Sequence, residues 1–249
     1  MRLAARAASA AIAVSALLAL LSACSASGHA RAASSPTSAS PSVDPYLAVE
    51  PLGCLPPGAQ AERIGQHGAR TIVAWSAPKS TKGVVLAPQL GDSACEWGQE
   101  WVKLRDEGYV VASFDWGPDD ADSMRAAANK LRSLGVKQLA LVGASKGGSF
   151  VAAMADELHA VAVVSLSPPS VFGVADAEAT RSGYHGPLLV YASQDDPNVP
   201  AGDSRLVARD ASQFKVFPGD AHGVALLNGQ YSTDVQAGID ATLRAGFGG

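Results

Sequence analysis

The sequence predicts an α/β fold: a mostly parallel, doubly wound sheet of about eight strands with helices on both faces. From residue 70 onward, short apolar runs alternate with longer amphipathic stretches, which is the pattern of successive βαβ units. One of these runs, at 139–142, leads through a Gly-x-Ser-x-Gly turn into residues with the apolar spacing of a helix. A buried strand and a helix are therefore expected to meet at a tight turn.

Residues 1–23 are expected to be a targeting segment outside the fold. Arg2 and Arg6 give it a positive start, and residues 8–21 form an apolar stretch too short to span a bilayer. The segment ends in Leu-Ser-Ala before Cys24, and so resembles the lipobox of bacterial lipoproteins, in which the cysteine carries the lipid. This resemblance implies an extracytoplasmic protein anchored to the bacterial cell membrane at Cys24. An ordinary signal peptide cut nearby is the alternative.

Residues 24–43 are small, polar and Pro-containing, which predicts a disordered tether. Residues 44–249 then form a single domain with one sizeable core. Without Arg2 and Arg6 the chain has 17 Lys and Arg against 23 Asp and Glu, a net charge of −6. Mild acidity without a basic cluster argues against a nucleic-acid partner and against electrostatic adhesion to anionic lipid. We expect a monomer whose membrane contact comes from the lipid alone.

Seven strands follow from the apolar runs, and a short segment ahead of the first predicts an antiparallel hairpin across His67-Gly68 at the leading edge. The predicted strands lie near residues 71–75, 83–87, 109–114, 138–142, 160–166, 188–192 and 214–217. In open α/β sheets, ligands bind beyond the carboxyl ends of the strands. Each polar residue can therefore be judged by the strand end that it occupies.

The turn at residues 143–147 is the candidate for a catalytic nucleophile. Strand and helix crowd together at such a turn, so only glycine fits at Gly143 and Gly147. The turn lifts the Ser145 hydroxyl above the sheet, where the N–H of Lys146 at the helix start faces the same point. We expect the Lys146 side chain to be a solvated charge. A plain Gly/Ser turn between two core elements is the alternative.

A base and an acid are predicted at the same edge of the sheet. His222 directly follows the last strand, whereas His159 and His185 precede strands and so lie at the opposite edge. Two adjacent acids, Asp195 and Asp196, directly follow the penultimate strand. Their position at the strand end does not decide which of the two orients the histidine.

With a serine, an acid and a histidine in this chain order, the region from about residue 70 to the C-terminus resembles the α/β-hydrolase superfamily. Its compactness is similar to the dienelactone-hydrolase-like and small esterase branch. The family's Asp-x-x-Val-Pro pattern matches residues 196–200 and favours Asp196 over Asp195, and its His-Gly pair matches residues 222–223. Dienelactone hydrolases use a cysteine nucleophile, so Ser145 argues against that particular substrate.

The resemblance implies a serine hydrolase whose Ser145-His222-Asp196 triad cleaves small carboxylic esters through an acyl-enzyme, with no cofactor and no metal. One oxyanion donor is the N–H of Lys146. By position the other is the N–H of Leu90, although the loop that carries it lacks the His-Gly of many relatives. An acyl thioesterase, a peptidase and a non-catalytic surface binding protein of the same fold are the alternatives.

Cys54 and Cys95 are expected to form a disulfide. Assigning Cys24 to the lipid leaves them as an even pair in an oxidising compartment. The bridge is expected to tie the N-terminal segment to the rim of the active site. Two separately buried thiols are the alternative.

The segment at 168–186, between two predicted strands, indicates whether a lid covers the pocket. It is too short for the helical lid of larger lipases, which predicts an open pocket that prefers short acyl chains. Trp116 and Phe172 follow strand ends and are predicted either to line that pocket or to belong to the core.

Overall fold

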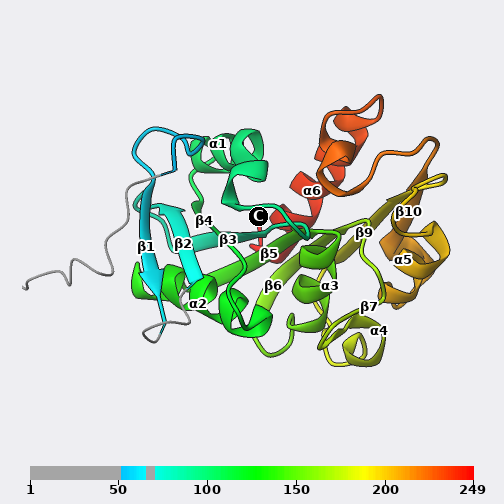
Figure 1. The fold of residues 1–249 in the computed structure, drawn as a ribbon, viewed down its shortest axis with the longest axis horizontal. Helices are drawn as coiled ribbons and strands as arrows, with labels where there is room; N and C mark the ends of the chain where they lie inside the picture. The colour runs from blue at the N-terminus through cyan, green and yellow to red at the C-terminus, as the bar shows by residue number, and fades with distance from the viewer. Residues whose placement is uncertain (1–51, 66–70) are drawn as a thin grey trace, which may run out of the picture. The chain divides into compact units, whose positions relative to one another are not determined.

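The computed structural model describes residues 52–65 and 71–249. It confirms the predicted fold class, with an eight-stranded, mostly parallel sheet and helices on both faces (Figure 1). The predicted targeting segment, the predicted tether with Cys24, and the turn at His67-Gly68 lie outside the described residues. Across 52–65 and 71–249, no helix combines the length and the apolar run that a membrane crossing needs.

The sheet has the strand order β1-β2-β4-β3-β5-β6-β9-β10. Its strands are β1 (Gln60–Ile64), β2 (Thr71–Ser76), β3 (Lys82–Ala87), β4 (Val110–Phe114), β5 (Gln138–Ala144), β6 (Ala160–Leu166), β9 (Leu188–Ser193) and β10 (Phe214–Phe217). The pairs β1–β2 and β2–β4 are antiparallel, and every other neighbouring pair is parallel. The predicted antiparallel leading edge is therefore the pair β1–β2, and each of the seven predicted strands is present.

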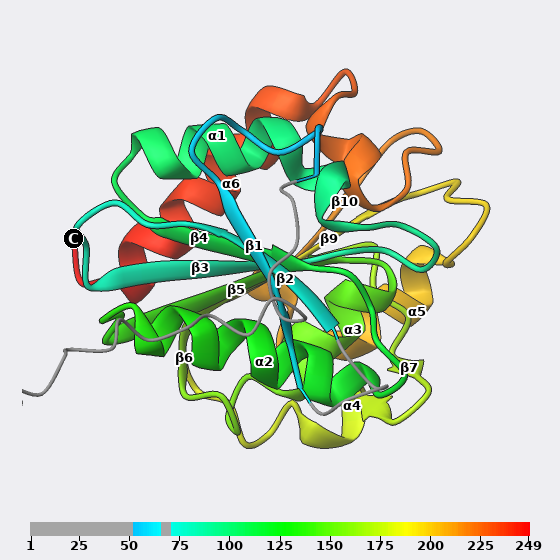
Figure 2. The same ribbon diagram turned by 60° about the vertical axis from the view of Figure 1, so that its left-hand side comes forward.

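Helices cover both faces of this sheet. Helices α1 (Gly98–Asp106) and α6 (Ser232–Gly246) pack on one face, and α2 (Asp120–Ser133), α3 (Lys146–Ala153), α4 (Ala177–Thr180) and α5 (Ala201–Val207) pack on the other (Figure 2). Central strands covered on both sides have no face left for water, so they are continuous apolar runs rather than alternating ones. Residues 84–87 at the end of β3, for example, are fully buried.

The strand order places the functional loops. The chain leaves β3 for β4 on one side and returns to β5 on the other, so the order reverses between the adjacent strands β3 and β5. Ligands of open α/β sheets bind outside the carboxyl ends of the strands at such a switch point. The loop at 88–92, after β3, and the turn at Ser145, after β5, both lie there.

The segment between β6 and β9 contains a small hairpin that the sequence did not predict. Strands β7 (Val171–Phe172) and β8 (Ala175–Asp176) pair antiparallel, and the four-residue helix α4 follows directly. Two-residue strands carry no periodicity, which is why the pattern of apolar residues did not reveal them. The segment holds no long helix of the kind that forms a lid.

Candidate active site

The turn between β5 and α3 has the strained backbone that the sequence predicts. Ser145 has φ 49° and ψ −118°, a conformation that costs free energy for any residue with a side chain. A Cβ atom at Gly143 would collide with the carbonyl of Gly147, and one at Gly147 with the carbonyl of Ala87. The Ser145 N–H donates to the Leu166 carbonyl of β6 at 2.8 Å. Close packing against two strands therefore holds the turn in place.

His222 follows β10 and faces an acid from the loop after β9. Its Nδ1 lies 2.8 Å from Oδ2 of Asp196, whose side chain is fully buried. The other oxygen, Oδ1, accepts the backbone N–H groups of Asn198 at 2.9 Å and Val199 at 3.1 Å. An aspartate that accepts N–H groups from the residues after it forms a local turn, so its carboxylate has one fixed orientation. Asp195, its neighbour, is exposed.

A cleft of about 410 Å³ brings the predicted nucleophile and base to the same surface. Its lining consists of Gln89, Leu90, Ser145, Pro169, Phe172, Asn198, Val199 and His222. Phe172 belongs to β7, in the segment after β6, and the other residues come from the loops after β3, β5, β6, β9 and β10. The cleft therefore lies at the carboxyl edge of the sheet. Phe172 lines the cleft, which was one of the two predictions made for this residue.

Trp116 is not among the lining residues of this cleft. It packs against the core beside Phe114 and Phe150, so for this residue the core reading was the right one. Its indole Nε1 donates to two carbonyl oxygens of the neighbouring loop, that of Pro88 at 3.1 Å and that of Gln89 at 3.2 Å.

The loop after β3 presents Leu90 to the cleft. Gly91 turns the chain with φ 82°, a value that favours glycine. Within the described parts of the chain, no acceptor takes the Leu90 N–H. The first N–H groups of a helix likewise have no acceptor within it, and Lys146 is the first residue of α3. Both predicted oxyanion donors are thus without an acceptor among the residues that the structure describes.

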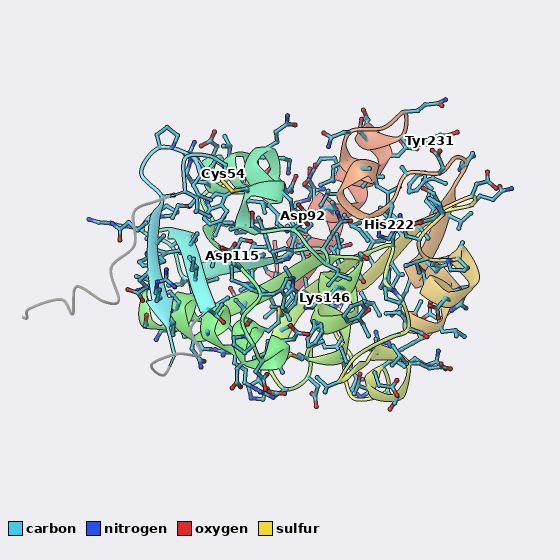
Figure 3. All side chains as sticks on the ribbon, viewed as in Figure 1. Cys54, Asp92, Asp115, Lys146, His222 and Tyr231 are labelled. Carbon is cyan, nitrogen blue, oxygen red and sulfur yellow. A yellow bond between two sulfur atoms is a disulfide. The ribbon has the colours of Figure 1, made fainter. Side chains whose placement is uncertain are left out.

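The side chain of Lys146 is buried, and the expectation of a solvated charge was wrong (Figure 3). Its Nζ lies 2.7 Å from Oδ1 of Asp120 and 4.1 Å from the centre of the Trp116 ring. A carboxylate and an aromatic face together compensate for the water that the ammonium group loses. Both partners come from residues after β4, so no local pattern around Lys146 signals this burial.

Glu96 is a partly buried acid beside the same loop, and the sequence did not single it out. Its Oε1 accepts the N–H of Gln89 at 3.1 Å. Burial raises the pKa of Glu96 to about 8; the Gln89 N–H opposes this rise, and the negative charge of Asp92 adds to it. Glu96 therefore holds the loop after β3 from the side of η1 (Ala94–Trp97).

The predicted disulfide between Cys54 and Cys95 is present, with Cα atoms 5.5 Å apart (Figure 3). Cys95 belongs to η1, which directly follows the loop after β3. The Ala94 N–H also donates to Oδ1 of Asp115 at 3.1 Å, which ties η1 to the end of β4. The bridge thus connects the residues before β1 to an element that supports the rim of the cleft.

The histidines that the sequence places at the opposite edge of the sheet lie apart from the cleft. His159 and His185 are exposed and precede β6 and β9, at the amino ends of the strands. Among the residues that the structure describes, no group of three or more His, Cys, Asp or Glu is arranged to hold a metal ion.

No family model matches the sequence, and no curated protein matches it. Solved structures do match the fold. Est1E from Butyrivibrio proteoclasticus has 17% identity and a TM-score of 0.60, over 74% of this chain and 98% of that one. An esterase from Pyrococcus furiosus has 14% identity and a TM-score of 0.62, over 75% and 89%.

A third match, from Xanthomonas campestris, is described as a member of the α/β serine hydrolases without lid. It has 18% identity and a TM-score of 0.54, over 77% of this chain and 97% of that one. Together with the strand order, these matches establish that the chain has the α/β-hydrolase fold. At such low identities they speak for the fold alone.

Proposed function

We propose that this protein is a serine hydrolase that cleaves small carboxylic esters through the triad Ser145, His222 and Asp196. The observation that carries the proposal is the 2.8 Å contact between His222 Nδ1 and the buried Asp196 carboxylate, in a histidine that lines the same cleft as the strained Ser145. The fold that the chain shares with esterases and serine hydrolases supports the reaction class.

The chemistry follows from these contacts. A serine hydroxyl is a weak nucleophile, so it needs a base that accepts its proton as it attacks the ester carbonyl. Asp196 accepts the Nδ1–H of His222, which leaves the Nε2 lone pair for the Ser145 proton. The imidazolium then gives that proton to the departing alcohol, and an acyl-enzyme remains. Water, deprotonated by the same histidine, attacks the acyl-enzyme, and the acid leaves as Ser145 recovers its proton.

The negative charge on the tetrahedral intermediate is stabilised by backbone N–H groups of Lys146 and Leu90. Neither has an acceptor within residues 52–65 and 71–249, and each donor is worth about 3 kcal/mol of the barrier when it is preorganised. Proline, phenylalanine and valine side chains in the cleft, at 169, 172 and 199, suit a short apolar acyl group.

The proposal is tested by labelling with a fluorophosphonate probe and by turnover of p-nitrophenyl acetate. We expect one label per chain, on Ser145, and no labelling of Ser145→Ala. Parallel assays with an acyl thioester and a peptide amide distinguish an esterase from a thioesterase or a peptidase of the same fold. A folded wild type that neither reacts with the probe nor turns over any of these substrates is a binding protein, and the proposal fails.

We propose further that Cys24 carries a lipid that anchors the protein outside the cytoplasm. The sequence around Cys24 supports this, and so does the disulfide, since disulfides persist in oxidising compartments. Cys24→Ser should move the protein from the membrane fraction to the soluble fraction. Equal membrane retention of the variant would contradict the proposal.

A further inference from the structure

The N–H of Leu90 belongs to the same peptide group as the carbonyl of Gln89. In a planar trans peptide, the C=O and the N–H point in opposite directions. A donor that holds the Gln89 oxygen on one side therefore turns the Leu90 N–H toward the other. The indole Nε1 of Trp116 is such a donor, at 3.2 Å from the Gln89 oxygen.

The two sides of this peptide differ in what they face. Leu90 lines the cleft with Ser145 and His222, whereas Trp116 does not line it and packs against the core. We propose that Trp116 is a positioning residue, whose indole N–H sets the plane of the Gln89–Leu90 peptide so that the Leu90 N–H faces the cleft. The inference rests on the proposed hydrolase function, since this orientation matters only where an oxyanion forms.

The Trp116 indole is itself held in place by its neighbours, as it must be to orient the Gln89–Leu90 peptide. The Phe114 ring meets it edge-on, with centroids 4.8 Å apart, and the Phe150 ring lies at 5.1 Å. The Lys146 ammonium lies over the ring at 4.1 Å and is fixed in turn by Asp120. Lys146 thus supplies one oxyanion donor from its backbone, while its side chain supports the tryptophan that orients the other.

Further contacts restrict the same loop. The Pro88 carbonyl accepts a second contact from the Trp116 indole, and the Gln89 N–H is held by Glu96 Oε1 at 3.1 Å. These contacts hold the peptides on both sides of Gln89 from outside the loop. They add to a turn contact within the loop, from the Asp92 N–H to the Gln89 carbonyl at 3.4 Å. A loop that lacks the His-Gly of many relatives is thus supported by residues that follow β4 and by residues of η1.

The test is Trp116→Phe, which keeps an aromatic ring and removes the N–H, with Trp101→Phe as the matched control. Trp101 donates its Nε1–H to Ser76 at 2.8 Å on the other face of the sheet, so the control also loses one indole hydrogen bond. Complete loss of an oxyanion donor lowers kcat by about 10²–10³, so a misaligned donor in Trp116→Phe should lower kcat by about 10- to 100-fold. We expect KM to stay within about twofold, and the control to keep kcat within about twofold.

A second substrate separates positioning from general damage. Sulfur is a weak hydrogen-bond acceptor, so the tetrahedral intermediate of a thionoester gains little from the oxyanion donors. Trp116→Phe should therefore reduce kcat for the oxoester far more than for the matching thionoester. A further variant with 3-benzothienylalanine at position 116 keeps the bicyclic shape and removes only the N–H, and it should show the same selective loss even where phenylalanine disturbs folding.

Each result decides the matter. Equal kcat for Trp116→Phe and Trp101→Phe, or equal losses on oxoester and thionoester, would overturn the role of Trp116 while wild-type turnover still supports the hydrolase. A selective loss on the oxoester supports the positioning role. A wild type without labelling or turnover would overturn both proposals together.

Discussion

Replacing Asp196 by asparagine should reduce kcat by three to four orders of magnitude, and the structure gives the reason. The two backbone N–H groups of Asn198 and Val199 both donate to Oδ1. In Asp196→Asn, those donors favour the amide oxygen at that position, which leaves the amide NH₂ facing His222 Nδ1. The histidine must then accept at Nδ1 and carry its proton on Nε2, where it cannot take the proton of Ser145.

The opposite orientation of the side-chain amide would restore the correct histidine tautomer, but it costs free energy. It would set the NH₂ against the two backbone N–H donors and leave both without an acceptor. That loss costs about 1–3 kcal/mol for a buried donor such as the Val199 N–H. The wrong tautomer therefore dominates, and the expected loss of about 10³–10⁴ in kcat corresponds to about 4–5.5 kcal/mol of barrier.

The assay is kcat and KM for p-nitrophenyl acetate, with thermal unfolding to check that the variant is folded. Asp195→Asn is the matched control, because Asp195 is exposed and its described hydrogen bond is a backbone one, from its N–H to the Gly219 carbonyl at 2.9 Å. We expect the control to keep kcat within about twofold. A larger loss in Asp195→Asn than in Asp196→Asn would refute the assignment of the acid.

Four other outcomes are expected. Ser145→Ala and His222→Ala should each abolish ester turnover while leaving the fold intact; substantial activity in a folded variant would exclude the mechanism. Rates on p-nitrophenyl esters should fall once the acyl chain exceeds about ten carbons, with no jump at the micellar transition. Because the pKa of Glu96 rises from 4.5 to about 8 on folding, the folded state binds more protons between these values. Its contribution to stability is therefore greatest below pH 4.5 and declines as the pH rises toward 8, and Glu96→Gln should remove that part of a pH series of unfolding midpoints. Reducing the Cys54–Cys95 bridge, which spans 41 residues, should lower both the unfolding midpoint and kcat; the stability loss is bounded by a loop-closure entropy of about 4 kcal/mol, and an unchanged kcat would show that the bridge does not support the cleft.

The sheet and the position of the proposed triad were predictable because they depend on local pattern. Continuous apolar runs locate strands that are covered on both faces, and the end of each run locates the functional edge. Ser145 directly follows β5, Asp196 lies three residues beyond the end of β9, and His222 lies five residues beyond the end of β10. The distinction between Asp196 and Asp195 was less accessible, since it depends on which side chain the loop buries, and only the family pattern favoured Asp196 in advance.

The contacts that hold the loop after β3 were not predictable from the loop itself. Trp116 lies 27 residues from Gln89 in the chain, and Asp120 lies 26 residues from Lys146. Nothing near these positions in the sequence signals such contacts, because they depend on how the residues after β4 and the start of α2 lie against α3. For the same reason Lys146 was predicted to be a surface charge, whereas its ammonium group lies buried against an aromatic ring.

This difference has a consequence for how substitutions should act. The side chains proposed to react are positioned by short turns at strand ends. Substituting one of them therefore removes a chemical step. The groups proposed to aim the donors lie on other elements. A change there should leave the nucleophile and base intact while it weakens the hydrogen bonds made only to the transition state. Substitutions at Trp116 should therefore lower kcat with little effect on KM or on labelling stoichiometry at Ser145, whereas substitutions at His222 should abolish both turnover and labelling. If a folded Trp116 variant instead lost labelling at Ser145 altogether, as the His222 variants should, aiming and reacting would not be separable functions of this fold.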